Sequence, residues 1–226
     1  MPLRLQGYYA ILDVKGTSVE LPAALAHAGE LLAARPCCLQ LRGKSLGTAV
    51  LCQLGHGLRP LCDRAGVPFC VNDRLDVALA VRADVVHLGQ GDLPLPDARR
   101  VREVAQASRL AIGISTHDVA EAQAAAAGGA DYVGFAPVFP TRSKEDAGPA
   151  AGLEALRAVA AAVAVPVVAI GGITVENAAA VAAAGAAAAA AIAAVDEAPD
   201  RTAAGQRIAA AFTRGAYTRT ASTNLR

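Results

Sequence analysis

Three short segments of the chain place polar or charged side chains directly after an apolar run that is typical of a β-strand. These segments are Gln40–Lys44, Asn72–Asp73 and Pro140–Lys144. Two of the three lysines, Lys44 and Lys144, lie in them, although arginine supplies nearly all the other positive charge. Side chains at strand ends are well placed for chemistry in a parallel sheet, and cations gathered there are suited to bind an anion.

The first two segments combine cations, carboxylates and amides. Arg42 could bind a diphosphate as a fork and Lys44 as a point charge. Asp73 and Asp92 follow successive apolar runs, and they could share Mg²⁺, a hard cation that prefers one or two carboxylates together with phosphate oxygens. Two plainer interpretations remain open, since Asn72–Asp73 could be a helix cap and Asp92 a turn residue.

Two amides and a glycine pair extend this pattern. Gln40 and Asn72 could form hydrogen bonds with a heterocycle. Gly171 and Gly172 follow an apolar run and precede a predicted helix, so their backbone N–H groups could approach a phosphate at the helix N-terminus. The loops after the last two strands of α/β barrels are frequent phosphate sites. Two anion sites, one metal site and no evident nucleophile indicate an enzyme that joins two phosphorylated molecules.

The histidines of the chain have structural interpretations. His87 lies inside an apolar run and is interpreted as a hydrogen-bonded core residue rather than a metal ligand. Ser115, His117 and Asp118 resemble a catalytic triad in composition, but neighbours in one turn cannot reach triad geometry. Capping of the next helix therefore explains Thr116 and Asp118 better. Ser115, at the end of its strand, could still contact a ligand.

Apolar runs alternate with helical stretches along the chain, which indicates a parallel sheet. Eight such units fit a closed (β/α)8 barrel better than an open sheet, and we expect this barrel to span residues 1–213, followed by a polar, disordered tail at 214–226. The weakest strand is the run of alanines near Ala188–Val195, because alanine favours helices. The other predicted strands are Tyr8–Leu12, Cys38–Leu41, Val67–Val71, Val85–Leu88, Leu110–Ile114, Tyr132–Phe135 and Val165–Ile170.

Composition narrows the class of protein. The formal net charge is +1, which gives no general reason to expect nucleic acid or an anionic membrane as a partner. Small-molecule substrates are the expected partners, and a homo-oligomer remains open. No stretch has the pattern of a signal peptide or membrane span, so a cytoplasmic location is expected. Five cysteines without Cys-x-x-Cys spacing are interpreted as reduced thiols.

Over nearly its whole length the sequence resembles the thiamine-phosphate synthase family. The motifs that carry the resemblance stand in family order and are Tyr9–Asp13, Gln40–Lys44, Val71–Arg74, His87–Pro94, Ile112–His117, Ala130–Thr141 and Val168–Ile173. The resemblance implies a (β/α)8 transferase that couples hydroxymethylpyrimidine diphosphate to thiazole phosphate. Diphosphate leaves first, in a Mg²⁺-assisted step, and the thiazole nitrogen captures the resulting pyrimidine-methyl cation.

The resemblance also implies roles for individual residues. Mg²⁺ would bind Asp73 and Asp92, and Arg42, Lys44 and Lys144 would stabilise the departing diphosphate. The residues implied for the pyrimidine diphosphate are Gln40, Arg42, Lys44, Asn72, Ser115 and Lys144, and those for the thiazole phosphate are Thr141, Ser143, Gly172, Ile192 and Ala193.

The sequence departs from the family pattern in two places. Gly91 stands where an acidic residue usually precedes the metal aspartate, and Ile192–Ala193 stands where a serine is common. Two alternatives therefore stay open: a related thiazole tautomerase, and a phosphate-binding barrel without catalytic activity. The tautomerase would not need the full set of Gln40, Arg42 and Lys44 together with the paired aspartates.

Overall fold

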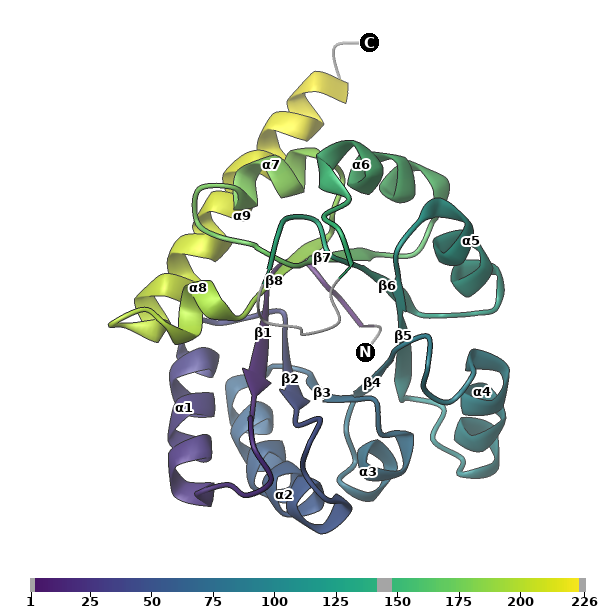
Figure 1. The fold of residues 1–226 in the computed structure, drawn as a ribbon, viewed down its shortest axis with the longest axis vertical. Coiled ribbons are helices and arrows are strands. Elements are labelled where there is room, and N and C mark those ends of the chain that lie inside the picture. Colours follow the sequence, from purple (N-terminus) through teal and green to yellow (C-terminus); the bar gives the residue numbers. More distant parts are fainter. Residues whose placement is uncertain (1–2, 142–147, 224–226) are drawn as a thin grey trace.

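The computed structural model describes residues 3–141 and 148–223, in which eight parallel strands close into a barrel (Figure 1). Each strand pairs with its neighbours in sequence, and β8 returns to pair with β1. The predicted fold class is confirmed. The strands are β1 (Gly7–Asp13), β2 (Cys38–Arg42), β3 (Phe69–Asn72), β4 (Val85–Leu88), β5 (Ala111–Thr116), β6 (Tyr132–Phe135), β7 (Val167–Ile170) and β8 (Ala188–Ala191).

Helices surround the barrel and cover the outer faces of the strands (Figure 1). Left-handed glycines end several of them, as at Gly66, where φ is 65° after α2. The described helices are α1 (Leu21–Ala33), α2 (Thr48–Ala65), α3 (Leu75–Ala80), α4 (Leu95–Val104), α5 (Val119–Ala127), α6 (Gly152–Ala162), α7 (Ala178–Ala183), α8 (Ala193–Asp196) and α9 (Arg201–Thr223).

Alternate residues of each strand face opposite sides of the barrel wall. On β1, Tyr8 and Ala10 belong to the outer core, which packs against the helices, whereas Tyr9 and Ile11 belong to a second cluster inside the barrel. Leu5 joins this inner cluster from the N-terminal segment. The barrel interior is thus a packed core, and in barrels of this kind functional residues lie where the strands end.

The alanine run does form the eighth strand, but a shorter one than predicted. β8 ends at Ala191, and residues Ala193–Asp196 form α8 instead of continuing the strand. Ala190 pairs with Tyr9 of β1 and with Ile170 of β7. Closure of the barrel therefore overrides the helical preference of alanine at 188–191 but not beyond it.

The predicted boundary at residue 214 falls inside α9, and this expectation is corrected. The helix continues through Thr223 and packs along α7, where a Cβ on Gly215 would lie 2.0 Å from the carbonyl oxygen of Ala179. Gly215 is buried and Ala216 packs against the outer core. Arg214 and Tyr217 are exposed, as expected for the solvent side of a packed helix.

Two capping predictions have different outcomes. Asp118 caps α5, because its side chain accepts a hydrogen bond from Glu121 N. Thr116 lies within β5, where its hydroxyl donates to the carbonyl of Gly134, so the capping prediction for Thr116 is wrong. All five cysteines are free thiols, as predicted. No helix in residues 3–141 and 148–223 has the length and apolarity needed to cross a membrane.

Candidate active site

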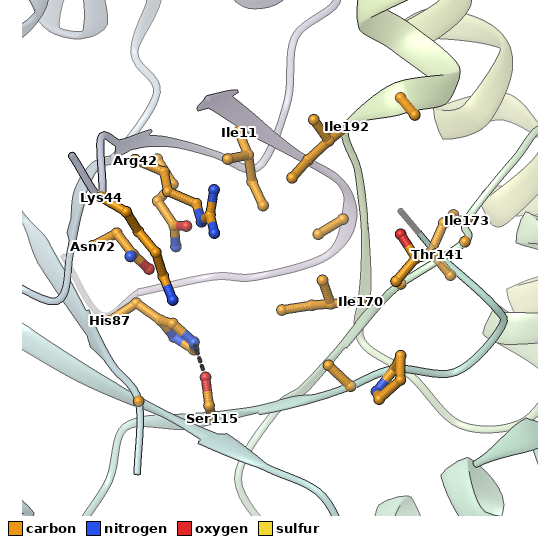
Figure 2. A pocket seen from close by; sticks show the side chains of 18 of the residues that line it. Ile11, Arg42, Lys44, Asn72, His87, Ser115, Thr141, Ile170, Ile173 and Ile192 are labelled. Carbon is orange, nitrogen blue, oxygen red and sulfur yellow. Dashed lines mark hydrogen bonds between the residues drawn. The ribbon is translucent and has the colours of Figure 1, made fainter. Parts of the chain in front are cut away.

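A cavity of about 830 Å³ lies at the carboxyl ends of the strands. It is lined by every predicted site residue that the structure describes. Figure 2 shows Arg42, Lys44 and Asn72 on one side of the cavity and Thr141 on the other. Ser143 and Lys144 lie outside the described residues. The predicted residues that line the cavity are Gln40, Arg42, Lys44, Asn72, Asp73, Asp92, Ser115, Thr141, Gly172, Ile192 and Ala193.

Arg42, at the end of β2, is held by a carboxylate on the neighbouring strand. Arg42 Nη1 lies 2.5 Å from Asp13 Oδ1, and the two residues are register partners on β1 and β2. The Asp13 side chain is only 2% exposed, and its Oδ2 has no hydrogen-bond partner among the described residues. The ion pair fixes one guanidinium edge and leaves the remaining N–H groups of Arg42 for the cavity.

Asp73 and Asp92 meet at the ends of β3 and β4. The pKa of Asp73 is raised to about 6, first by burial and then by the hydrogen bond and negative charge of Asp92, against the opposing charges of Lys44 and Arg42. Asp73 has φ of 63°, a left-handed conformation that is rare outside glycine. Such a pair of carboxylates, strained and mutually repelling when ionised, gains stability from a cation placed between them.

The two carboxylates could supply some, but not all, of the oxygen ligands that a divalent metal ion needs. Asp92 Oδ2 accepts a hydrogen bond of 2.6 Å from Gly89 N, which orients the carboxylate. Within the described ranges, no cluster of three or more His, Cys, Asp or Glu side chains could hold a metal. A Mg²⁺ ion here would therefore take two carboxylates from the protein and its other oxygens from ligand and water.

Gln40 of β2 and Ser115 of β5 both line the cavity. Each forms a hydrogen bond with a buried side chain of the barrel interior. Gln40 is 3% exposed, and its Nε2 donates to the hydroxyl of Tyr9 at 3.0 Å. Ser115 Oγ lies 2.9 Å from His87 Nε2, the contact drawn in Figure 2. His87 is buried and hydrogen-bonded, which confirms its interpretation as a core histidine.

The opposite wall consists of backbone and small residues. A Cβ on Gly172, where φ is 64°, would lie 2.5 Å from the carbonyl oxygen of Pro140, and one on Gly171 would lie 2.7 Å from Pro137 Cβ. Asn177 holds the turn, because its Nδ2 donates to Gly172 O and its Oδ1 accepts from Thr174 N. No side chain larger than hydrogen fits at either glycine.

This glycine turn differs from the expected helix N-terminus. α7 begins only at Ala178 and has six residues. Ahead of α7, the backbone N–H of Thr174 donates to Asn177 Oδ1. Any anion site here would therefore rely on backbone N–H groups of the turn.

Between the two walls lies an apolar surface. Ile11 of β1, Ile170 of β7 and Ile192 after β8 point into the cavity (Figure 2). Thr141 lies beyond them, on the side of the glycine turn. The cavity thus has a charged end, an apolar middle and an end rich in backbone groups, which suits a ligand or ligand pair with polar groups at both ends.

Sequence reasoning missed several residues that support the site. Asp13 and Tyr9 were noted only as parts of a motif, and Asn177 was not noted at all. Strand periodicity could have found Asp13, because it follows the β1 run just as Arg42 follows the next one. No sequence signal identifies the hydrogen bonds of Asn177, which depend on the fold of its turn.

The closed barrel and the cavity at the carboxyl ends of its strands define the class of (β/α)8 barrel proteins. Within this class, residues 9–195 match the model of the family described as thiamine monophosphate synthase, and the chain belongs to this family.

Named relatives and a solved structure agree with the family. The chain is 47% identical to the thiamine-phosphate synthase of Moorella thermoacetica, over 78% of this chain and 82% of the relative. The identity to the Methanoregula boonei thiamine-phosphate synthase is 52%, but that match spans 62% of this chain and only 63% of the relative. The solved thiamine phosphate pyrophosphorylase of Pyrococcus furiosus is 35% identical, with a TM-score of 0.81, over 95% of this chain and 98% of the other.

Proposed function

We propose that this protein is a thiamine-phosphate synthase, which joins hydroxymethylpyrimidine diphosphate to thiazole phosphate with release of diphosphate. The observation that carries the proposal is the division of one cavity into two chemically different ends around an apolar middle. Family membership supports the same activity. The substrates are small molecules, and a cytoplasmic location and a homo-oligomer stay predictions.

The charged end accounts for the departure of the diphosphate. Arg42 and Lys44 offer positive charge to the leaving group, and Lys144 is proposed to add a third. Asp73 and Asp92 would hold Mg²⁺, which when bound neutralises diphosphate charge as a Lewis acid. The Asp13 ion pair keeps Arg42 from turning toward the aspartates. These residues act mainly on charge that develops as the bond breaks, so they should affect kcat more than substrate affinity.

The other polar groups position the two reactants. Gln40, Asn72 and Ser115 are proposed to bind the pyrimidine ring, and Thr141, Ser143 and the backbone at Gly172 and 192–193 to bind the thiazole phosphate. The isoleucines of the apolar middle exclude water from the path between the pyrimidine methylene carbon and the thiazole nitrogen. Holding these two atoms close replaces a protein nucleophile as the source of rate.

The test is a direct assay. The protein is incubated with both substrates and Mg²⁺, and thiamine phosphate is measured by mass and by thiochrome fluorescence. Formation of thiamine phosphate that depends on both substrates, and that falls strongly in Asp73→Asn, supports the proposal. Binding of thiazole phosphate without any product would instead support the phosphate-binding barrel, and isomerisation of a thiazole carboxylate phosphate would support the tautomerase.

A further inference from the structure

Gln40 and Ser115 come from β2 and β5, yet three buried side chains connect them beneath the cavity. Gln40 Nε2 donates to Tyr9 Oη at 3.0 Å, and the Tyr9 and Tyr132 hydroxyl oxygens are 3.3 Å apart. Tyr132 Oη lies 2.9 Å from His87 Nδ1, and His87 Nε2 lies 2.9 Å from Ser115 Oγ. A continuous row of hydrogen bonds therefore crosses the barrel interior from one wall residue to the other.

The surrounding structure makes room for this row. Tyr9 and Tyr132 are each 1% exposed and His87 is 5% exposed. A Cβ on Gly113 would lie 2.1 Å from Tyr132 Cζ, and a Cβ on Gly134 would lie 2.8 Å from His87 Cε1. The rings of His87 and Tyr132 also stack, with centroids 5.5 Å apart. The large majority of polar groups buried this deeply are hydrogen-bonded, and here packing fixes their partners.

The protons in this row have a preferred order. The Gln40 amide nitrogen can only donate, so the Tyr9 oxygen accepts, and the single Tyr9 proton is then free for Tyr132. Tyr132 in turn donates to His87 Nδ1, so the neutral imidazole carries its proton on Nε2 and donates it to Ser115. Burial raises the pKa of Tyr9 and of Tyr132 well above the usual value, so both hydroxyls keep their protons.

The opposite order is less favourable. If Ser115 donated to His87, the row would run backwards and Tyr9 would accept from both Gln40 and Tyr132. The Tyr9 proton would then have the sulfurs of Cys38 and Cys70 as its acceptors within this cluster, and thiol sulfur is a weak acceptor.

We infer that Tyr9, Tyr132 and His87 are positioning residues, a hydrogen-bond relay of fixed direction that sets how Gln40 and Ser115 face the substrate. The relay directs Gln40 Oε1 to the ligand as an acceptor and the Ser115 hydroxyl as a donor. This inference rests on the proposed function and deepens it. The ligand that matches is a planar heterocycle with an exocyclic amine at one edge and an accepting ring nitrogen at another, as in an aminopyrimidine.

The first test measures the histidine tautomer in the free protein, so it needs no turnover. The chain has four histidines, and ¹⁵N NMR of protein labelled at histidine distinguishes protonated from unprotonated ring nitrogens. The signals of His87 are assigned by their loss in His87→Gln. We expect the Nε2–H tautomer in the parent and a mixture of tautomers in Tyr132→Phe. A parent protein with the Nδ1–H tautomer, or no change in Tyr132→Phe, would overturn the relay.

The second test separates positioning from packing. Tyr132→Phe keeps the ring and removes only the hydroxyl, and we expect KM for the pyrimidine diphosphate to rise about tenfold while KM for thiazole phosphate stays unchanged. The matched control is Tyr8→Phe, whose buried hydroxyl has no hydrogen-bond partner in the described part of the chain and lies in the outer core. It should change neither KM.

Other outcomes would contradict either the hydrogen-bond relay or the proposed function. Equal changes in both KM values, or a lowered melting temperature with unchanged kinetics, would mark Tyr132 as merely structural. If Tyr132→Phe does not fold, Tyr9→Phe breaks the same row at its Gln40 end and carries the same expectation. A parent protein with the expected tautomer but no thiamine phosphate formation would reject the proposed function and leave the relay intact.

Discussion

The two walls of the cavity are built by different means. The wall at the ends of β2 to β5 presents long charged or amide side chains, and two of them are held by a second side chain, Arg42 by Asp13 and Gln40 by Tyr9. The wall at β6 to β8 presents glycine, alanine and backbone groups, held in place by contacts such as that of Asn177 with Gly172. One wall therefore offers a ligand mainly side chains, and the other offers mainly backbone groups. We call the wall at β2 to β5 the charged wall and the wall at β6 to β8 the backbone wall.

This difference has a physical cause. A diphosphate leaving group gains charge during the reaction, and only ionised side chains or a metal can compensate several charges. A phosphate that stays unchanged needs only shape and N–H donors, which a glycine turn supplies without the entropy cost of ordering long side chains. The predictions below sharpen or break this comparison, and they run from the largest expected effect to the smallest.

The largest effect is expected at the charged wall. Lys44→Ala should lower kcat on the order of 100-fold, because it removes charge that stabilises the transition state, and it should leave the melting temperature almost unchanged, since Lys44 is exposed. Steady-state kinetics and thermal unfolding measure both. Lys15→Ala is the control, because this other exposed lysine lies outside the cavity lining. A similar loss of kcat in both variants would contradict a specific role for Lys44.

At the backbone wall we expect a steric effect instead. Gly172→Ala should raise KM for thiazole phosphate by about tenfold and cost about 1–3 kcal/mol of stability, because the new Cβ meets Pro140 O in a strained conformation. Calorimetric unfolding and kinetics with varied thiazole phosphate provide the measurements. The control is Gly29→Ala in α1, where a Cβ has no atom within 4 Å. Unchanged thiazole phosphate binding in Gly172→Ala would remove this turn from the site.

Adding a side chain donor to the backbone wall should strengthen it. Ala193→Ser introduces a hydroxyl at the start of α8, beside the cavity, and a hydrogen bond to a charged group contributes about 1.5–3 kcal/mol. We expect thiazole phosphate to bind roughly tenfold more tightly, with no change toward the pyrimidine diphosphate. Isothermal titration measures both. No gain, with the hydroxyl shown crystallographically to point into the cavity, would mean that the phosphate binds elsewhere.

The smallest effect concerns proton competition at the charged wall. The pKa of Asp73 is raised to about 6 in the folded protein, from its usual value of 3.8. A proton on Asp73 must leave before a metal binds, so apparent Mg²⁺ affinity should fall by about fourfold between pH 7 and pH 5.5. Titration of the free enzyme with Mg²⁺ at several pH values measures this, and the pH dependence should vanish in Asp73→Asn.

The same pKa shift has a consequence for stability without metal. Between pH 4 and pH 6 the folded protein binds more protons at Asp73 than the unfolded chain does, so its contribution to the free energy of unfolding falls as pH rises through this range. The difference in unfolding free energy between the parent and Asp73→Asn should follow this sign in urea titrations. A difference that grows in favour of the parent as pH rises would contradict the raised pKa.

The sequence was sufficient for the strands and for much of the charged wall. Apolar runs and the polar residues that follow them lie close together in sequence, so Arg42, Lys44 and Asp73 could be predicted locally. The ion pair of Asp13 and the hydrogen bonds of Asn177 could not, because their partners are fixed only when the barrel closes. The extent of α9 was missed for a related reason, since the tail was predicted from its polar composition, whereas the close contact of Gly215 with Ala179 exists only in the folded structure.

The run Ala186–Ala191 limits which side chains can be placed inside the barrel. Ala188 and Ala190 face the same interior cluster as Tyr9 and Tyr132, and their small volume leaves the space that the two phenol rings fill. In a barrel of fixed cross-section, large residues on some strands require small ones on others. The repeated alanines are therefore required by the space available inside the barrel. Substitution by valine or leucine at 188 or 190 would displace the tyrosines rather than strengthen the strand.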